Sequence, residues 1–302
     1  MFSKKFWIKL TNKQKYQEIK NLERIKNDKN LFNYKYKNKI DLIQNKIKDQ
    51  KKLNFLHSGH AADIVNALPV IKELSRNHEC NLYININKPI KFYYKHPAEK
   101  FYLNDKVFKM LEPLIKNQNY INKIERFSGQ NIDVDFDLIR ELPINVLFDN
   151  TKYAFVITGS QPDLTSKYLE ADDHKNIKDQ VVIQRTFRYR NQFINYEFLN
   201  NYKNLLFVGV KEEFDDLKKT VKNLEFYDCK DFLEMASLIK SARFTLGNSS
   251  LAFPIAEGLK VPRLLEACPY FPAAQAHGKY GYDFYFQSHF EGLFSHLYSL
   301  KK

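Results

Sequence analysis

One carboxylate, Asp63, lies in a turn of small residues between an apolar run and an apolar helical pattern. The turn belongs to the stretch HSGHAADIVNALPVIKELS, residues 57–75. Small side chains let a ligand approach the backbone closely, and the dipole of a following helix keeps a carboxylate in its first turn ionised. Such a carboxylate can accept a proton from a hydroxyl group. It can equally serve only as a helix cap, and both interpretations stay open here.

A second turn of small polar residues occurs within the stretch FTLGNSSLAFPIAEGL. An apolar run ends at Gly247, and a helical pattern begins after Asn248, Ser249 and Ser250. Backbone N–H groups and the helix dipole at such a position favour a phosphate group. Because Asn and Ser are also the usual N-cap residues, an ordinary cap without a ligand is the alternative.

Three arginines follow the apolar run VVIQ. They are Arg185, Arg188 and Arg190, and Phe187 and Tyr189 lie between them. A guanidinium group binds phosphate oxygens through two parallel hydrogen bonds, so the cluster suits a diphosphate. A solvated loop that carries its charges at the rim is the alternative.

Two short motifs resemble metal sites. DVDFD at 133–137 contains a DxD pattern, but its apolar residues alternate with the aspartates as they would in a half-exposed strand. HSGH offers His57 and His60 without an evident third ligand. The sequence has no GxGxxG or Walker A loop and no GxSxG nucleophile elbow. We therefore predict no metal ion.

The candidate residues follow apolar runs that alternate with helical patterns, which is the rhythm of a parallel α/β sheet. In the first half we expect strands at 52–59, 80–87 and 121–129, and helices at 61–76 and 105–118, the second bent or split by Pro113. In the second half we expect strands at 180–186, 204–210, 224–229, 243–247 and 261–267, and helices at 212–222, 231–242 and 249–259.

These elements predict two Rossmann-like, doubly wound domains that face a central cleft. The chain of 302 residues, 44% of them hydrophobic, is long enough for two cores. We place the domains at 53–165 and 166–302 and join them through a polar segment near 150–180. Ligands bind at the carboxyl ends of strands in such sheets, and both small-residue turns fall at such ends.

Residues 1–52 form a basic extension in front of the domains. They carry a net charge of +11, out of +13 for the whole chain. Apolar residues recur in the extension at near-helical spacing, which predicts an amphipathic helix: Leu10, Tyr16, Ile19, Leu22 and Ile25. It could form a helical hairpin packed on the body or attach to an anionic membrane surface. Nucleic acid is not expected as a partner, because no base-reading motif accompanies the charge.

The sequence indicates a cytoplasmic protein. Its three cysteines are scattered, without CxxC or Cys/His spacing, and fit buried free thiols in a reducing compartment. No signal-peptide pattern and no apolar stretch of membrane-spanning length is evident. Attachment through the basic extension would make the protein peripheral to the inner face of the membrane.

The motifs together resemble those of bacterial glycosyltransferases with the GT-B architecture, and most nearly glycosyltransferase family 9, the lipopolysaccharide heptosyltransferase-like group. AADIVNALPVIKEL is similar to the family's Gly-Asp-Ile/Val turn and Leu-Pro helix, with Ala62 in place of the glycine. LGNSSLAFPIAEGLKVPRLLE is similar to its later strand, polar turn, Ala-rich helix and Gly-x-Pro. The family's Asp-Ser/Thr-Gly and following His are absent from that turn. The resemblance covers about 53–270.

The resemblance implies a metal-independent glycosyltransferase of cell-surface polysaccharide biosynthesis. The first domain would bind a glycan or lipid-linked acceptor, and the second would bind a nucleotide sugar, which is a substrate, so that no cofactor is needed. The family's turn aspartate, taken as the general base, matches Asp63. His60 lies in the same turn and is the second candidate.

In the second domain, Arg185 and Arg188 would bind the diphosphate together with the turn 247–250. Glu257 or Glu266 would hold the ribose hydroxyls, although Glu257 equally fits a solvent-facing helix position. Two other functions stay open: a nucleotide-sugar epimerase of the same fold, and a non-catalytic GT-B protein that binds a glycan or acts as a scaffold.

Overall fold

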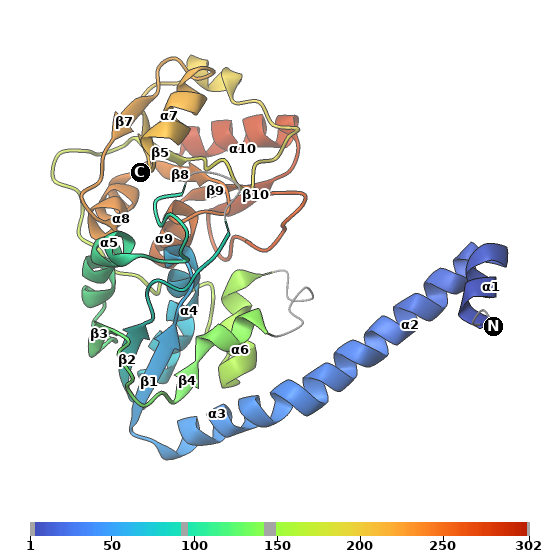
Figure 1. The fold of residues 1–302 in the computed structure, drawn as a ribbon. Helices are drawn as coiled ribbons and strands as arrows, with labels where there is room; N and C mark the ends of the chain where they lie inside the picture. Colours follow the sequence, from blue (N-terminus) through green and yellow to red (C-terminus); the bar gives the residue numbers. More distant parts are fainter. Residues whose placement is uncertain (1–3, 92–95, 142–148, 301–302) are drawn as a thin grey trace.

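The computed structural model describes residues 4–91, 96–141 and 149–300, and it shows two stacked α/β domains with a long helical arm (Figure 1). The N-terminal domain holds a four-stranded parallel sheet in the order β3-β2-β1-β4. Its strands are β1 (Lys52–His57), β2 (Glu79–Ile84), β3 (Lys123–Arg126) and β4 (Val134–Asp135). Its helices are α4 (Ala61–Leu74), α5 (Asp105–Lys116) and α6 (Tyr153–Thr158), with 3-10 turns η2 (Phe136–Arg140) and η4 (Asn150–Lys152).

The C-terminal domain holds a six-stranded parallel sheet in the order β10-β9-β8-β5-β6-β7. Its strands are β5 (Val181–Gln184), β6 (Leu205–Val208), β7 (Glu225–Tyr227), β8 (Phe244–Gly247), β9 (Arg263–Glu266) and β10 (Gly281–Phe284). Its helices are α7 (Lys211–Lys218), α8 (Phe232–Ser241), α9 (Ala252–Leu259) and α10 (Gln287–Ser299), with a 3-10 turn η5 (Glu197–Asn201). The prediction of two parallel, doubly wound domains is confirmed.

The central strands of the second sheet are buried along their whole length because helices cover both faces of the sheet. Every residue of β5, β6, β8 and β9 is buried. The chain leaves β5 toward β6 on one side and continues from β8 to β9 on the other. The carboxyl ends of β5 and β8 therefore lie at a topological switch point, where open sheets bind ligands.

Two elements of the N-terminal domain differ from expectation. Helix α5 runs through Pro113 without a break. Lys109, whose carbonyl loses its N–H partner to the proline, lies on the exposed side of the helix, where water can replace that partner. The segment 133–137 forms a strand of only two residues, because the side chain of Asp135 accepts a hydrogen bond from the N–H of Asp137 and starts the 3-10 turn η2.

The two domains share one apolar core. Helix α4 packs against α9 and α5 packs against α8, and a single cluster of buried side chains extends from Ile64 in one domain to Ile255 in the other. All eight residues of α9 are buried, and all but Glu257 are apolar or glycine. The domain interface is therefore a hydrophobic core.

The segment 158–176, which lies within the stretch near 150–180 expected as a polar linker, makes hydrogen bonds to both domains. Tyr168 and Leu169 are buried, and their N–H groups donate to the carbonyl of Gly258 in α9. Glu170 exchanges hydrogen bonds with the side chain of Gln118 in the N-terminal domain. The linker thus contributes side chains to the shared core.

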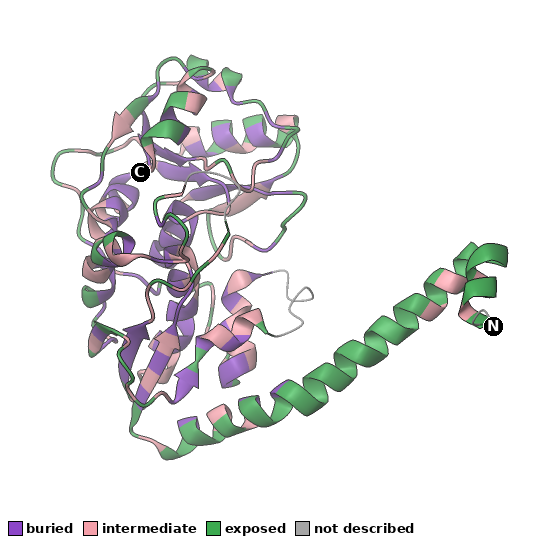
Figure 2. Ribbon diagram, viewed as in Figure 1, coloured by how far each residue is buried: buried purple, intermediate pink, exposed green. Residues whose placement is uncertain are grey.

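The basic extension is helical, as predicted. It comprises α1 (Lys4–Thr11), α2 (Lys13–Leu31), a π-helical turn (Phe32–Tyr36) and α3 (Lys37–Asp49). Helix α3 packs against α6 and buries Ile40 and Ile47 in the core, and Tyr36 at the end of the π-helical turn is buried beside them. Helices α1 and α2 project away from the body and are exposed over most of their length (Figure 2). None of the helices in the described ranges is long and apolar enough to cross a bilayer.

Adding a methyl group to Gly258 should destabilise the protein, because a Cβ there would lie 2.7 Å from two carbons of the Leu169 side chain. We expect Gly258→Ala to lower the free energy of unfolding by about 1–3 kcal/mol, the usual cost of overpacking. Gly292→Ala is the matched control, because a Cβ there meets nothing within 4 Å in the middle of α10. It should raise stability by about 0.5–1 kcal/mol. Urea denaturation measures both, and equal effects would contradict the tight packing of the linker on α9.

Candidate functional site

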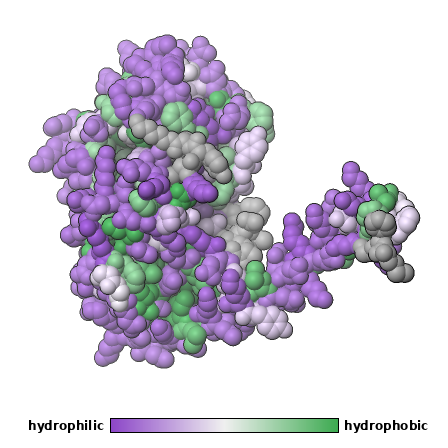
Figure 3. Space-filling model, viewed as in Figure 1, coloured by the Kyte–Doolittle hydropathy of each residue, from purple (hydrophilic) through white to green (hydrophobic). Residues whose placement is uncertain are grey.

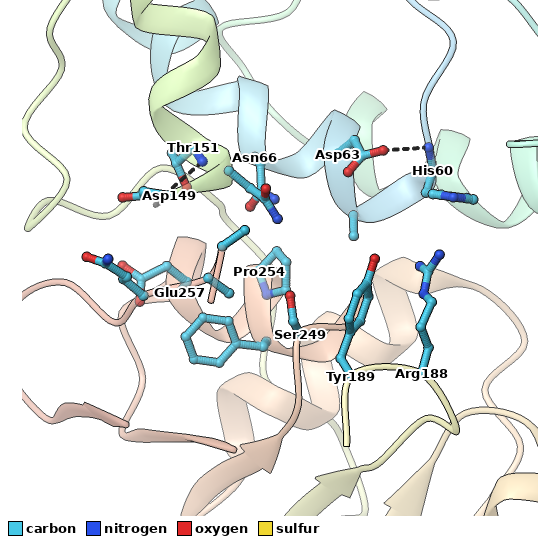
Figure 4. Close-up of a pocket in the computed structure, with 16 residues that line it drawn as sticks. His60, Asp63, Asn66, Asp149, Thr151, Arg188, Tyr189, Ser249, Pro254 and Glu257 are labelled. Carbon is cyan, nitrogen blue, oxygen red and sulfur yellow. Dashed lines mark hydrogen bonds between the residues drawn. The ribbon is translucent and has the colours of Figure 1, made fainter. Parts of the chain in front are cut away.

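The main candidate site is a pocket between the domains, at the carboxyl ends of β1, β5 and β8 (Figure 4). Its volume is about 40 Å³ and it opens to solvent, so it is a narrow cleft between the two domains. Its upper wall in Figure 4 comes from the N-terminal domain: His60, Ala62, Asp63, Asn66, Asp149, Asn150 and Thr151. The opposite wall comes from the C-terminal domain: Arg188, Tyr189, Ser249, Phe253, Pro254, Glu257, Ala273, Ala274 and Gln275.

Asp63 is in the first turn of α4, on the side of the helix that faces the pocket. Its Oδ2 atom accepts a hydrogen bond from the N–H of His60 at 3.0 Å, which fixes the side chain and caps the helix. The other carboxylate oxygen has no hydrogen-bond partner among the described residues. Asp63 therefore makes the cap contact and still presents an acceptor to the pocket.

His60 lines the pocket, and one nitrogen of its ring is held by the backbone. Its Nδ1 atom lies 2.9 Å from the carbonyl of Tyr102, which can only accept, so the proton is on Nδ1. Burial lowers the pKa of His60, and it lowers the pKa of His57 to about 4 against the opposing effect of nearby aspartates. Both rings are neutral at physiological pH. The Nδ1 atom of His57 accepts a hydrogen bond from the N–H of Gly59 and so shapes the turn.

Of the three clustered arginines, Arg188 lines the pocket. Arg185 makes two hydrogen bonds of 2.7 and 2.9 Å to the fully buried carboxylate of Glu266. Arg190 pairs with Asp216 at 2.7 Å. These two arginines hold the ends of the loop, and the guanidinium group between them faces the opposite domain (Figure 4).

The turn after β8 holds the arginine loop in place. The side chain of Asn248 is buried and donates to the carbonyls of Thr186 and Arg188 at 3.0 and 2.8 Å. Gly247 belongs to the strand, where a Cβ would lie 3.1 Å from the backbone of β5. Ser249 lines the pocket, whereas Ser250 does not.

The two glutamates expected near the ribose are both buried. Glu257 lines the pocket, but its carboxylate pairs with Lys260 and Arg263, and it is not the solvent-facing residue that its helix position allowed. Glu266 accepts hydrogen bonds from Arg185, from the N–H of Asn191 and from the hydroxyl of Tyr196. The structure therefore brings together Asp63, His60, Arg188, Ser249 and Glu257 at the pocket, and it places Arg185 and Glu266 behind its wall.

The carboxylates of DVDFD each have protein partners. Asp133 accepts from the N–H of Asn54, and Asp137 accepts from Ser58, Lys88 and Arg140. Burial alone would raise the pKa of Asp137, but these donors lower it to about 2. Asp137 thus anchors the end of β1 just before the turn that carries Asp63. The described residues contain no group of three or more possible metal ligands.

The pocket includes residues that the sequence did not single out. Asp149 is buried and its Oδ2 lies 2.8 Å from the Nε2 atom of His277, so the two domains meet in a polar contact beside the pocket. Burial would raise the pKa of Asp149, but hydrogen bonds from His277 and Thr151 lower it. Only the spacing Asp-x-Thr, typical of an N-cap, could have indicated this residue.

Another unpredicted carboxyl group supports the arginine loop. Glu213 is buried in the first turn of α7, and its Oε1 atom accepts from the N–H of Phe187 at 3.1 Å. Burial raises the pKa of Glu213 to about 7. The sequence did not indicate that Glu213 is buried, because acidic residues in the first turn of a helix are usually exposed.

No family model matches the sequence, and no curated protein matches it either. Solved structures do match the fold. A family 9 glycosyl transferase from Veillonella parvula DSM 2008 superimposes with a TM-score of 0.52 and 10% identity, over 84% of this chain and 91% of that chain. The E. coli heptosyltransferase WaaC with ADP gives a TM-score of 0.54 and 9% identity, over 82% and 100%. WaaC with ADP-2-deoxy-2-fluoro heptose gives 0.51 and 8%, over 77% and 92%.

The chain therefore has the GT-B fold, with two Rossmann-like domains and the pocket between them. Within that fold it resembles the glycosyltransferases of family 9, including the heptosyltransferases. At these identities the likeness concerns the fold, so the function is argued from the pocket itself.

Asp137→Asn should show how strongly the donors around Asp137 stabilise the N-terminal domain. A carboxyl pKa of about 2 in the folded state, against 3.8 ordinarily, corresponds to about 2 kcal/mol of stability. Because the folded pKa is lowered, this contribution is complete above about pH 5 and is lost as the pH falls toward 2. The difference in unfolding free energy between the wild type and the variant should shrink across that window in urea titrations. Asp172→Asn, on an exposed side chain, is the control, and a pH-independent difference for Asp137→Asn would contradict the assignment.

Proposed function

We propose that this protein is a glycosyltransferase that moves a sugar from a nucleotide-sugar donor to a hydroxyl group of a glycan or lipid-linked acceptor. The observation that carries the proposal is the opposition of Asp63 to Arg188 and Ser249 across the pocket between the domains. An acceptor for a proton lies on one wall, and a cation with a hydroxyl group lies on the other. Glycosyl transfer from a nucleoside diphosphate needs both.

Asp63 acts as the general base in this proposal. The acceptor oxygen attacks the anomeric carbon while its proton passes to the free carboxylate oxygen of Asp63. The bond between the anomeric carbon and the diphosphate oxygen breaks, and the electron pair leaves with the nucleoside diphosphate. The hydrogen bond from the N–H of His60 orients the carboxylate.

Arg188 stabilises the leaving diphosphate. Arg185 forms an ion pair with Glu266, and Arg190 forms one with Asp216. Of the three arginines, Arg188 lines the pocket. Ser249 adds a hydroxyl group beside it, and Phe253 and Pro254 form an apolar wall. The ADP-containing structures of the similar E. coli enzyme support a nucleotide sugar as the donor. The reaction as proposed uses no metal ion and no cofactor.

Two other functions fit the same fold. An epimerase would act on the nucleotide sugar without an acceptor, and a non-catalytic scaffold would bind a glycan without turnover. The carboxylate oxygen of Asp63 that faces the pocket is the proton acceptor that transfer to a hydroxyl group requires. Nucleotide release that depends on an added acceptor separates the transferase from both.

Asp63→Asn should keep the fold and lower the turnover number by about 10²–10⁴, the usual cost of losing a general base. The Asn carbonyl can still accept from the N–H of His60, so the cap remains. Asp63→Ala should lose activity and also about 0.5–2 kcal/mol of stability. Turnover and thermal midpoint are measured for both variants. Full activity of Asp63→Asn would remove Asp63 as the base.

Arg188→Ala should weaken nucleotide binding by about 1.5–3 kcal/mol, the value of a charge-assisted hydrogen bond. Arg185→Ala should mainly destabilise the fold, by about 3–5 kcal/mol, because it leaves the buried carboxylate of Glu266 without its cation. Titration calorimetry with ADP, UDP and GDP measures the first effect, and thermal unfolding measures the second. Unaltered affinity of Arg188→Ala for a nucleotide that binds the wild type would exclude Arg188 from the site.

A further inference from the structure

The arm, which we define as residues 4–31, is a pair of helices that has no place in the proposed reaction. Helix α1 folds back on α2, where Lys5 pairs with Glu23 and the ammonium group of Lys9 lies 5.8 Å from the centre of the Tyr16 ring. No residue of α1 or α2 is buried. Helix α3 packs on the body and connects it to the arm, which projects away from the two domains (Figure 1).

Large apolar side chains of the arm face solvent. Trp7 is 59% exposed, Leu10 65%, Leu22 60% and Ile25 59%. In α1, the exposed residues Phe6, Trp7 and Leu10 share one side of the helix by their spacing, and Ile8 on the other side is partly covered. Apolar side chains gather at the far end of the arm in Figure 3. Exposed clusters of this kind mark surfaces that interact with something apolar.

The same helices are strongly basic. The arm has nine Lys and Arg residues against three acidic residues, a net charge of +6. Lys26 follows Leu22 by four residues, and Lys29 follows Ile25 by the same interval, so each of these two apolar side chains has a cation one turn away on the same side. Lysine ammonium groups above an apolar face are typical of helices that lie in the interface of an anionic bilayer.

We infer that the arm docks on an anionic lipid bilayer, with the apolar side chains of α1 and α2 in the interfacial layer and the lysines among the headgroups. A second copy of the arm fits less well, because two surfaces of +6 each repel one another. Nucleic acid fits less well too, since phosphate contacts would leave Trp7, Leu10, Leu22 and Ile25 in water. The inference does not depend on the catalytic assignment, and it extends the proposed function by giving the protein a place of action.

Trp7 is the single tryptophan of the chain, so intrinsic tryptophan fluorescence reports on the arm alone. The full-length protein is mixed with vesicles of phosphatidylcholine that contain one quarter phosphatidylglycerol, and with vesicles of phosphatidylcholine only. We expect a blue shift of the emission and co-sedimentation with the anionic vesicles, both weakening as salt rises. Lipids brominated in the upper acyl chain should quench Trp7.

The double variant Leu10→Glu/Leu22→Glu keeps Trp7 and should bind the anionic vesicles at least about tenfold more weakly. Phe193→Glu is the control, because Phe193 is 68% exposed on the C-terminal domain, and it should bind like the wild type. Unchanged thermal midpoints show that both variants fold. Equal binding by the double variant would overturn the inference. So would a lipid-free, concentration-dependent blue shift with dimerisation, or a blue shift with duplex RNA instead of vesicles.

Discussion

The packing of α4 on α9 is the contact on which the rest of the structure depends. Each helix follows a central strand of its own sheet, and each begins at the carboxyl end of that strand. Joining the two helices through buried apolar side chains turns the two strand ends toward each other and leaves a pocket between them. Residues of the two helices then line opposite walls of the pocket: Asp63 and Asn66 on α4, and Phe253 and Glu257 on α9.

The charges around the pocket are mostly neutralised in pairs, and this limits which groups can act on a ligand. Glu257 is neutralised by Lys260 and Arg263, Glu266 by Arg185, and Asp149 has His277 as its partner. A buried charge without a partner lowers the stability of the fold, so the ion pairs are what make buried charged side chains tolerable in the pocket wall. Asp63 differs because it keeps one oxygen for the pocket while the helix start satisfies the other.

The fold could be predicted from the sequence more completely than the site. β1, β5 and β8 each contain a short run of mostly apolar residues followed by a turn of small residues, so these strands and the turns at Asp63 and Gly247 could be predicted. The pairing of Arg185 with Glu266 was not evident, because these residues are 81 positions apart and only the parallel order of β5, β8 and β9 brings them together. For the same reason the sequence could not show that Arg188 is the arginine of the loop that lines the pocket.

The shared core also determines how this protein can be divided. Cutting the chain between its sheets would expose the apolar faces of α4 and α9 and would remove Tyr168 and Leu169 from their contacts with Gly258. Neither half is therefore an independent module, although each has a complete sheet of its own. A hybrid that joins one half to the complementary half of another GT-B protein would have to inherit α4, α9 and the segment 158–176 as a matched set. A hybrid protein would therefore have to keep the whole domain interface, together with the pocket beside it, from a single parent.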